Sequence, residues 1–310
     1  MEQEEPVWRR QSEVARVRLL VLDIDGTIED KAGYIRESVA PAIRSAQRLG
    51  VAVAHATGRG FQLSLPAVNS LGSSLPVICH EGALVKDPKT GLVHRHWFLS
   101  PRAVGQVLDH TELLSKSGRV SVHFHVDDEL YVSNLNSASI KYFEGSTIAP
   151  IVVSDLRAML NRTITKMRVV SDDAALITRL RNRLQNADSR ARLRQYKSLT
   201  FLEVDHPAVN KRLAVSYLAE NIMGLRAENV MAIGDDFPDI EMLHYAGIGV
   251  AMGNAPLAVK AFADWVTTTI EKDGVARAIE RWILRDTLMP VGSLKRIHQA
   301  QARYRLRHIA

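Results

Sequence analysis

Short apolar runs alternate with amphipathic stretches at both ends of the chain. Near the N-terminus the runs lie at residues 18–22, 51–54 and 76–79, and each ends in a polar loop. Continuous apolar runs of this length are typical of parallel strands buried on both faces. The stretch at residues 38–49 predicts a helix with Ser38 as its N-cap, and another helix ends near Leu71. This alternation predicts an α/β fold with a doubly wound, Rossmann-like parallel sheet.

The same alternation returns after Val209 and completes the predicted core. The expected strands lie at residues 229–233, 247–251 and 265–268, and the expected helices lie at 210–223, 256–262 and 275–284. Ligands of such sheets bind at the carboxyl ends of the strands. We therefore expect the catalytic or binding residues in the loops that follow these strands.

Residues 84–197 have a different pattern. Residues 118–127 alternate polar and apolar positions, and residues 129–133 predict a hairpin partner across Asp127-Asp128. A second hairpin is expected from residues 190–196 and 199–204, and helices are expected near 101–115, 151–161 and 172–186. Mixed helices and antiparallel strands predict a separate α+β domain inserted into the first, where its position makes it a lid.

These patterns predict four parts of the chain. Residues 1–15 are an expected disordered N-terminus, residues 16–84 and 198–285 form the catalytic core, residues 85–197 form the α+β cap domain, and residues 286–310 form a basic C-terminal tail. The tail predicts an amphipathic helix that packs on its own chain or on a partner.

Composition indicates an ordinary globular protein with a sizeable core. The 310 residues are 46% hydrophobic and 24% charged, and Cys79 is the single cysteine, so no internal disulfide is possible. The sequence contains no apolar stretch of about 20 residues and no secretory pattern at its start, so we expect a cytoplasmic protein without a membrane partner.

The net charge of +6 is concentrated in two basic regions, residues 176–197 and 286–310. Neither region carries interleaved aromatic residues or a recognised binding module, so both are expected to be solvated faces, and nucleic acid is not an expected partner. Composition leaves the oligomeric state open.

The first strand ends in the most informative residues, Asp23-Ile24-Asp25-Gly26-Thr27. Asp23 and Asp25 are two positions apart, so they point to the same face of the strand and their carboxylates converge. Repulsion between the two is relieved by a cation or by a proton on one of them. A surface turn would also explain Asp and Gly at these positions.

Four stretches occur in one order along the chain: Asp23-Ile24-Asp25-Gly26-Thr27, Ala56-Thr57-Gly58-Arg59, Lys211, and Gly234-Asp235 with Asp239. The order resembles the haloacid dehalogenase superfamily, and the details resemble its Cof-type phosphatases. Later matches are Ala246-Gly247-Ile248-Gly249-Val250-Ala251-Met252-Gly253-Asn254-Ala255 and Glu271-Lys272-Asp273-Gly274-Val275-Ala276. The resemblance covers roughly residues 16–284, and the set of motifs is much more specific than any one of them.

The resemblance implies a Mg²⁺-dependent phosphomonoesterase that acts on a small phosphorylated metabolite, such as a sugar phosphate or a phosphorylated cofactor. Asp23 would be the nucleophile that forms an aspartyl-phosphate, and Asp25 the general acid and base. Asp23, the Asp25 carbonyl and Asp235 would hold Mg²⁺, an ion that prefers oxygen ligands.

The remaining roles that the resemblance implies belong to residues around the phosphate and the metal. Thr57, Gly58 and Lys211 would bind phosphoryl oxygens. Asp236 and Asp239 would support the metal ligands, with Asp239 orienting Lys211 or a metal-bound water. The expected substrate contacts are Arg59, Glu81 and His125.

The chain departs from the family pattern at three positions. Pro238 replaces an Asn, Arg212 replaces a Gly, and Glu81 replaces an Asn. Glu81 would oppose an anionic substrate unless its carboxylate faces a cation or points away. These departures keep two alternatives open, a phosphoryl transferase of the same fold and a catalytically weakened binding or regulatory protein.

His80, His123 and His125 also suggest a metal site. His123 and His125 alternate with apolar residues on one strand, so a solvated or active-site-facing polar side is the preferred interpretation.

Overall fold

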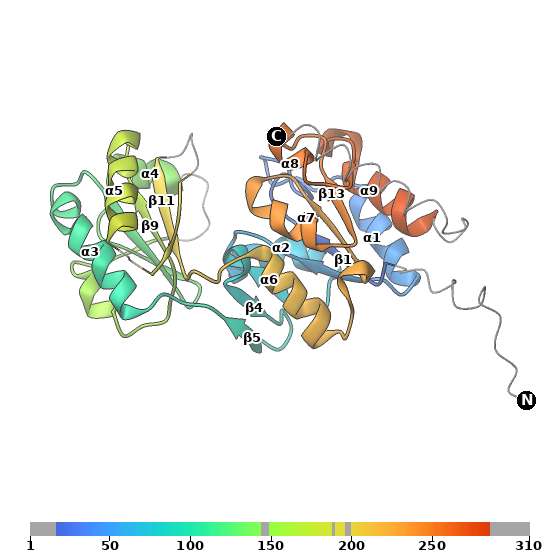
Figure 1. Cartoon of the computed structure of the whole chain (residues 1–310), viewed down its shortest axis with the longest axis horizontal. Coiled ribbons are helices and arrows are strands. Elements are labelled where there is room, and N and C mark those ends of the chain that lie inside the picture. The colour runs from blue at the N-terminus through green and yellow to red at the C-terminus, as the bar shows by residue number, and fades with distance from the viewer. Residues whose placement is uncertain (1–16, 144–148, 188–189, 196–199, 286–310) are drawn as a thin grey trace, which may run out of the picture. The chain divides into compact units, whose positions relative to one another are not determined.

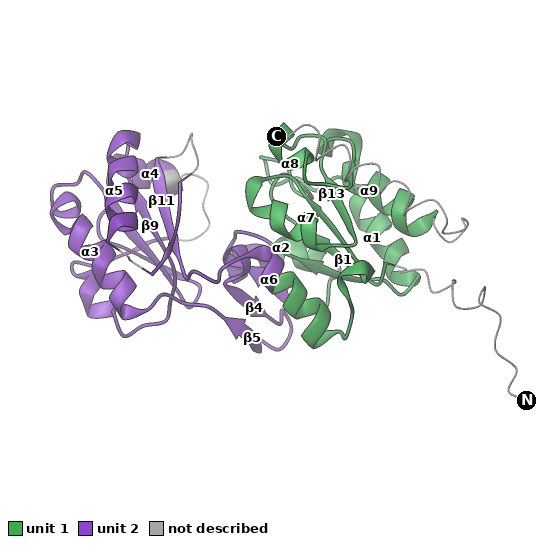
Figure 2. Cartoon of the chain, viewed as in Figure 1, with its two compact units in different colours: residues 1–56, 66–76, 214–310 green, residues 57–65, 77–213 purple. Residues whose placement is uncertain are grey.

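The computed structural model describes residues 17–143, 149–187, 190–195 and 200–285. Within these ranges the chain divides into two compact units (Figure 2). Unit 1 comprises residues 17–56, 66–76 and 214–285, and unit 2 comprises residues 57–65 and 77–213. The predicted N-terminal segment and the basic tail lie outside the described residues.

Unit 1 contains a five-stranded sheet in the order β14-β13-β12-β1-β2, and all neighbouring strands are parallel. Its strands are β1 (Leu19–Leu22), β2 (Ala52–His55), β12 (Val230–Gly234), β13 (Ile248–Ala251) and β14 (Trp265–Val266). β1 is central, and its four side chains are fully buried. The predicted parallel core is confirmed, because uninterrupted apolar runs suit strands covered on both faces.

The helices of this part of the chain connect the strands (Figure 1). They are α1 (Val39–Arg48), α2 (Phe61–Ser70), α6 (Lys211–Ser216), α7 (Ile240–Tyr245), α8 (Leu257–Lys260) and α9 (Gly274–Ile279), with π-helical segments at Tyr217–Ile222 and Glu280–Leu284; α2 and α6 carry residues of both units. Ser38 does not cap α1, because its hydroxyl donates instead to Asp273 Oδ1 at 2.7 Å.

Unit 2 contains a six-stranded sheet in the order β10-β11-β9-β6-β7-β8, antiparallel except where β7 pairs with β8. Its strands are β6 (Ser121–Val126), β7 (Glu129–Val132), β8 (Ile151–Val152), β9 (Ile164–Val170), β10 (Arg192–Arg194) and β11 (Phe201–Asp205), and its helices are α3 (Pro101–Lys116), α4 (Ser137–Phe143) and α5 (Ala174–Asn186). Apolar side chains of α3 and α5 pack on one face of the sheet. The predicted α+β insertion is confirmed.

The predicted hairpin between β6 and β7 is also present. Asp127 and Asp128 connect the strands with φ values of 49° and 68°, and two consecutive residues with positive φ are typical of a tight hairpin turn. Aspartate tolerates this conformation better than most residues.

The strand after residue 76 does not join the parallel sheet as predicted. β3 (Val77–Cys79) pairs antiparallel with β4 (Leu84–Lys86), which pairs with β5 (Val93–His96) in a separate three-stranded sheet. The short turn at His80–Gly82 returns the chain directly onto β3, and a connection this short permits only antiparallel pairing.

Residues 151–161 do not form the predicted helix. Ile151–Val152 is β8, and Leu156–Met159 is a single 3-10 turn that begins where Asp155 accepts a hydrogen bond from the Arg157 N–H at 2.8 Å. No helix in the described ranges is long and apolar enough to cross a membrane.

Candidate active site

Three carboxylates of unit 1 lie together past the carboxyl ends of two parallel strands. Asp23 follows β1 directly, Asp235 follows β12, and Asp239 lies in the 3-10 turn Phe237–Asp239. One oxygen from each lies within 4.8 Å of the other two. Asp23 and Asp239 are 5% and 1% exposed, so most of their charge is removed from water. We call these three residues the acid group.

Backbone hydrogen bonds fix Asp239 in the acid group. Its Oδ2 accepts from the N–H groups of Asp235 and Asp236 at 2.9 Å and 3.0 Å. A Cβ at Gly234 would lie 2.6 Å from the Asp239 carboxyl carbon, so this position requires glycine. Asp236 is exposed, and its Oδ1 accepts from the Phe237 N–H at 2.8 Å, which starts the turn.

The loop after β1 lies directly against Asp235. Gly26 has φ +79°, and a Cβ there would collide with the Asp235 carboxylate, so both the conformation and the close approach require glycine. The Thr27 hydroxyl donates to Asp235 Oδ1 at 3.2 Å. Asp25, which follows in the same loop, is exposed.

Asn254 is a site residue to which sequence reasoning assigned no role. Its Nδ2 donates to the Gly26 carbonyl at 2.8 Å and to Asp235 Oδ2 at 3.3 Å, while its Oδ1 accepts from the Ile270 N–H at 3.3 Å. It therefore joins the loops after β1 and β12. The sequence feature that could have identified Asn254 is its position in the Gly-rich stretch that follows the buried strand β13.

The residues expected to bind phosphate lie in unit 2. Thr57 is fully buried, and its Oγ1 accepts from the Arg59 N–H at 3.1 Å. Its N–H donates to the Ile78 carbonyl at 2.8 Å, and its carbonyl accepts from the Glu81 N–H at 3.0 Å. These bonds bring Thr57, Gly58 and Arg59 beside the turn at His80–Gly82.

Glu81 faces a cation, which is one of the two arrangements that the sequence left open for a carboxylate at this position. Its Oε2 lies 3.8 Å from the Lys211 Nζ, and the two side chains are 13% and 3% exposed. A Cβ added to Gly58 would collide with Glu81 Oε1. The structure therefore brings Gly58, Glu81 and Lys211 together.

One face of the six-stranded sheet carries buried charge. The register places His125, Lys166, Asp205 and Arg192 in one row across the strands, and His123, Arg168, Glu203 and Arg194 in the next. Glu203 Oε1 lies 2.7 Å from Arg168 Nη2 and 3.3 Å from Lys166 Nζ, and Asp205 Oδ2 lies 2.6 Å from Arg194 Nη2. Opposite charges on neighbouring strands stabilise the pairing.

The pKa values of this face follow from burial and from these partners. Burial opposes ionisation of Glu203, but Lys166, Arg168 and Arg194 together hold its pKa well below the usual range. Burial and the neighbouring Glu203 raise the pKa of Asp205 despite the cations. Burial also opposes the charge of Lys166, yet Glu203 and Asp205 raise its pKa.

The histidines of β6 do not form a solvated face, since His123 is buried and His125 is half-buried, while the alternative of an active-site-facing polar side stays a prediction. His123 is fully buried, hydrogen-bonds to Ser121 and Ser139 at 3.1 Å and 3.0 Å, and stacks on Phe143. The His125 ring lies 5.4 Å from that of His80. Burial lowers the pKa of His80 and His123 to about 3 and that of His125 well below 6.5, so all three are neutral at pH 7.

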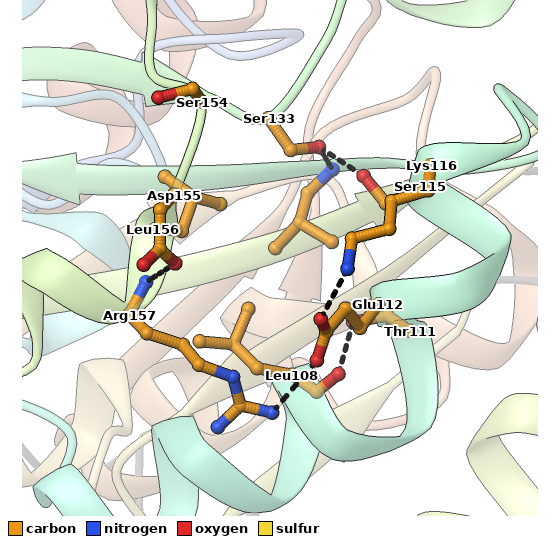
Figure 3. A pocket seen from close by; sticks show the side chains of 11 residues that line it. Leu108, Thr111, Glu112, Ser115, Lys116, Ser133, Ser154, Asp155, Leu156 and Arg157 are labelled. Atoms are coloured by element: carbon orange, nitrogen blue, oxygen red, sulfur yellow. Dashed lines mark hydrogen bonds and ion pairs between the residues drawn. The ribbon is translucent and has the colours of Figure 1, made fainter.

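A hollow of about 320 Å³ lies elsewhere in unit 2, beside α3 (Figure 3). Its cations are already paired, since Lys116 lies 2.6 Å from Glu112 and Arg157 lies 2.6 Å from Asp109. None of the predicted site residues lines it. Because its charges are balanced internally, the hollow is a poor candidate for binding a phosphate group.

Comparison with known proteins agrees with the fold. The family model of haloacid dehalogenase-like hydrolases matches residues 20–279. A 5-amino-6-(5-phospho-D-ribitylamino)uracil phosphatase of Bacillus subtilis is 30% identical over 288 residues, covering 88% of this chain and 99% of that protein. A phosphoglycolate phosphatase of Methanothermobacter thermautotrophicus is 27% identical over 271 residues, covering 86% and 99%.

Solved structures give the same result. A haloacid dehalogenase-like hydrolase from Bacteroides thetaiotaomicron superposes with a TM-score of 0.76 at 27% identity, covering 86% of this chain and 99% of that chain. A sugar phosphatase of subclass IIB superposes with a TM-score of 0.70 at 25% identity, covering 86% and 98%. The matched sequence, the fold and the acid group together show that this chain belongs to the haloacid dehalogenase-like hydrolase family.

Proposed function

We propose that this protein is a Mg²⁺-dependent phosphomonoesterase that acts through an aspartyl-phosphate on Asp23. The observation that carries the proposal is the acid group, with Asp23 placed directly past the central strand of the parallel sheet. The names of the related phosphatases support the reaction class. A carboxylate nucleophile divides phosphate ester hydrolysis into two easier displacements.

The residues present fit a hard divalent cation. The acid group offers three carboxylate oxygens within 4.8 Å of one another, and oxygen is the ligand that Mg²⁺ prefers. Asp23, Asp235 and the Asp25 carbonyl would hold the ion, and Asp239 would support them from the following turn. When bound, Mg²⁺ offsets the charge that otherwise repels a nucleophile from a phosphate ester.

The proposed reaction uses two carboxyl groups, one as the nucleophile and one as the general acid and base. The Asp23 carboxylate attacks phosphorus, the ester P–O bond breaks, and the Asp25 carboxyl gives its proton to the departing alkoxide. Asp25 then takes a proton from water, the water oxygen attacks phosphorus, and phosphate leaves with Asp23 restored. The exposure of the Asp25 side chain suits a group that must exchange protons with both substrate and water.

Thr57, Gly58 and Lys211 are the proposed phosphate-binding residues. The buried Thr57 is held by three hydrogen bonds of its own backbone and side chain, and Lys211 is almost fully buried at the start of α6. Fixed donors of this kind stabilise the charge that develops on a transferring phosphoryl group. Arg59, Glu81 and His125 are further proposed substrate contacts.

The substrate class is proposed from the relatives. The relatives are named for small phosphorylated metabolites or as a sugar phosphatase. We also propose the domain limits of 16–84 and 198–285 for the catalytic core and 85–197 for the cap. The buried Cys79 thiol, bonded to Ser64, is consistent with a cytoplasmic location.

The test is phosphate release from an aryl phosphate and from a panel of metabolite phosphates, with Mg²⁺ and with chelator, for the wild type and Asp23→Asn. We expect Mg²⁺-dependent turnover that the substitution lowers on the order of 10⁴-fold or more. Formation of a new ester in place of free phosphate would instead indicate a transferase. Ligand binding without any turnover would indicate a regulatory protein.

A further inference from the structure

We propose that Glu81 is a specificity-determining residue, because its carboxylate occupies the position that a phosphoryl group would take beside Lys211 and Gly58. A phosphate ester must displace this carboxylate, so the site favours esters whose leaving group supplies further binding energy. The inference rests on the proposed function, in which Thr57, Gly58 and Lys211 bind phosphate.

The contacts of Glu81 place both of its oxygens against the proposed phosphate-binding residues. Oε2 lies 3.8 Å from the Lys211 Nζ, and Oε1 lies so close to Gly58 that a Cβ there would collide with it. All of these residues lie in unit 2. A carboxylate is an anion of the same charge sign as a phosphoryl group, so the two compete for one ammonium.

The ion pair is loose for a pair that is this well buried. The separation of 3.8 Å exceeds hydrogen-bond length, and Oε2 is buried without a hydrogen-bond partner. Buried ion pairs stabilise a fold only when good geometry and additional hydrogen bonds compensate for the loss of hydration. A purely structural pair would be expected to close to a hydrogen bond, whereas a loosely held carboxylate is readily displaced.

The backbone at Glu81 also carries strain. His80 and Glu81 have φ values of 50° and 58°, in the left-handed region that non-glycine residues rarely adopt. Hydrogen bonds from the His80 and Glu81 N–H groups to the Arg59 and Thr57 carbonyls hold this turn. Strained residues of this kind are concentrated at functional sites. The turn thus aims the Glu81 side chain at Gly58 and Lys211.

Competition of this kind converts leaving-group binding into selectivity. Free phosphate and small generic esters bind only through the contacts of the phosphoryl group. Part of that binding free energy is lost because Glu81 must be displaced. A larger substrate makes remote contacts, and remote binding energy can offset such a cost. Glu81 therefore also reduces inhibition by the phosphate product.

The experiment compares wild type with Glu81→Gln, which keeps the shape of the side chain and removes its charge. Calorimetry with inorganic phosphate in Mg²⁺ buffer gives the affinity, and kcat/KM for an aryl phosphate against the best metabolite phosphate gives the selectivity. We expect phosphate to bind about tenfold tighter to the variant, and the selectivity ratio to fall about tenfold. Glu81→Asn serves if the Gln variant fails to fold, because Asn tolerates positive φ.

Two control variants separate the possible failures. Glu37→Gln removes one exposed carboxylate from the loop before α1 and should leave both readouts unchanged. Lys211→Met should abolish phosphate binding. Unchanged or weaker phosphate binding by Glu81→Gln, with binding still lost in Lys211→Met, would overturn the role of Glu81 and leave the proposed function standing. If Lys211→Met binds phosphate as the wild type does and no ester is hydrolysed, the proposed function fails as well.

Discussion

Among the residues that the structure describes, each unit has a cluster with buried carboxylates, and the two clusters are built in opposite ways. In unit 1 the acid group brings Asp23, Asp235 and Asp239 together within 4.8 Å, on loops that follow parallel strands. In unit 2 Glu203 and Asp205 lie on a strand, between the cations of neighbouring strands. The first arrangement gathers like charges, whereas the second alternates opposite charges.

The difference indicates what each cluster is for. Like charges at short distance raise the energy of the folded chain unless a cation or proton offsets them, so the acid group is suited to binding a metal ion. In the second cluster each carboxylate lies beside cations of neighbouring strands, and such ion pairs form without a ligand. A carboxylate removed from the first cluster should therefore affect activity, and one removed from the second should affect stability.

The largest expected effect follows from Asp235→Asn, which removes one carboxylate of the acid group. Loss of an outer partner of a metal ligand already costs about 10–100-fold, so loss of a ligand should lower Mg²⁺-dependent activity by more than about 100-fold. Because binding to the folded state alone raises stability, Mg²⁺ should raise the Tm of the wild type and not of the variant. Thermal melts with and without Mg²⁺ measure this.

A graded control for this prediction is Asn254→Ala. Asn254 donates to Asp235 and to the Gly26 carbonyl, so its loss should weaken the Mg²⁺ response by about 10–100-fold without abolishing it. An Asp235→Asn variant whose Tm still rises with Mg²⁺ as in the wild type would remove the acid group as the metal site.

The next largest effect is expected from Glu203→Gln in unit 2. The substitution leaves Lys166, Arg168 and Arg194 with one carboxylate fewer in a buried cluster, and breaking a buried ion pair from one side costs about 3–5 kcal/mol. Urea unfolding should show this loss of unfolding free energy, while the Tm response to Mg²⁺ persists.

The matched control is Glu129→Gln, an exposed carboxylate at the start of β7. Its loss should change stability by less than about 0.5 kcal/mol, as is usual for surface substitutions. Equal stability of the two variants would show that the charged rows of the sheet contribute nothing to folding.

The two clusters also differ in how well the sequence predicts them. For the acid group, apolar runs identified the strands and placed the loops after them at one edge of the sheet, and the family resemblance then singled out Asp235 and Asp239 beside Asp23. Strand β9 was not predicted, although Lys166 to Val169 alternate polar and apolar positions, and the partners Glu203 and Asp205 of its cations lie on another strand. Whether those charges are buried depends on tertiary pairing, which periodicity does not contain.

Two contacts of the site were not predicted for the same reason. The sequence showed Glu81 and Lys211 but not that they face each other, because that contact joins residues distant in the chain. It showed Asn254 but not its bonds to the loops after β1 and β12. The antiparallel pairing of β3 was missed because an apolar run alone does not specify its neighbour.

The smallest expected effect is the dependence of stability on pH that comes from buried histidines. Such histidines occur in both units. Burial lowers the pKa of His55 in β2 to about 4 and that of His123 in β6 to about 3, below the unfolded value of 6.5. Well above pH 6.5 both histidines are neutral in the folded and in the unfolded chain. Their contribution to the free energy of unfolding therefore does not change with pH in that range. Below that pH the unfolded chain takes up protons that the folded chain refuses, and stability falls by about 1.4 kcal/mol per pH unit for each histidine.

Replacing one buried histidine should therefore make the pH profile shallower. We expect the unfolding free energy of His123→Gln to decline between pH 6 and pH 5 less steeply than that of the wild type, by about 1.4 kcal/mol per pH unit. Urea unfolding at each pH measures the slope, and a constant loss of packing does not alter it. His244→Gln, at an exposed position in α7, should keep the wild-type slope. A wild-type slope in His123→Gln would mean that His123 takes up its proton without unfolding, and that the polar face of the sheet in unit 2 is open to water.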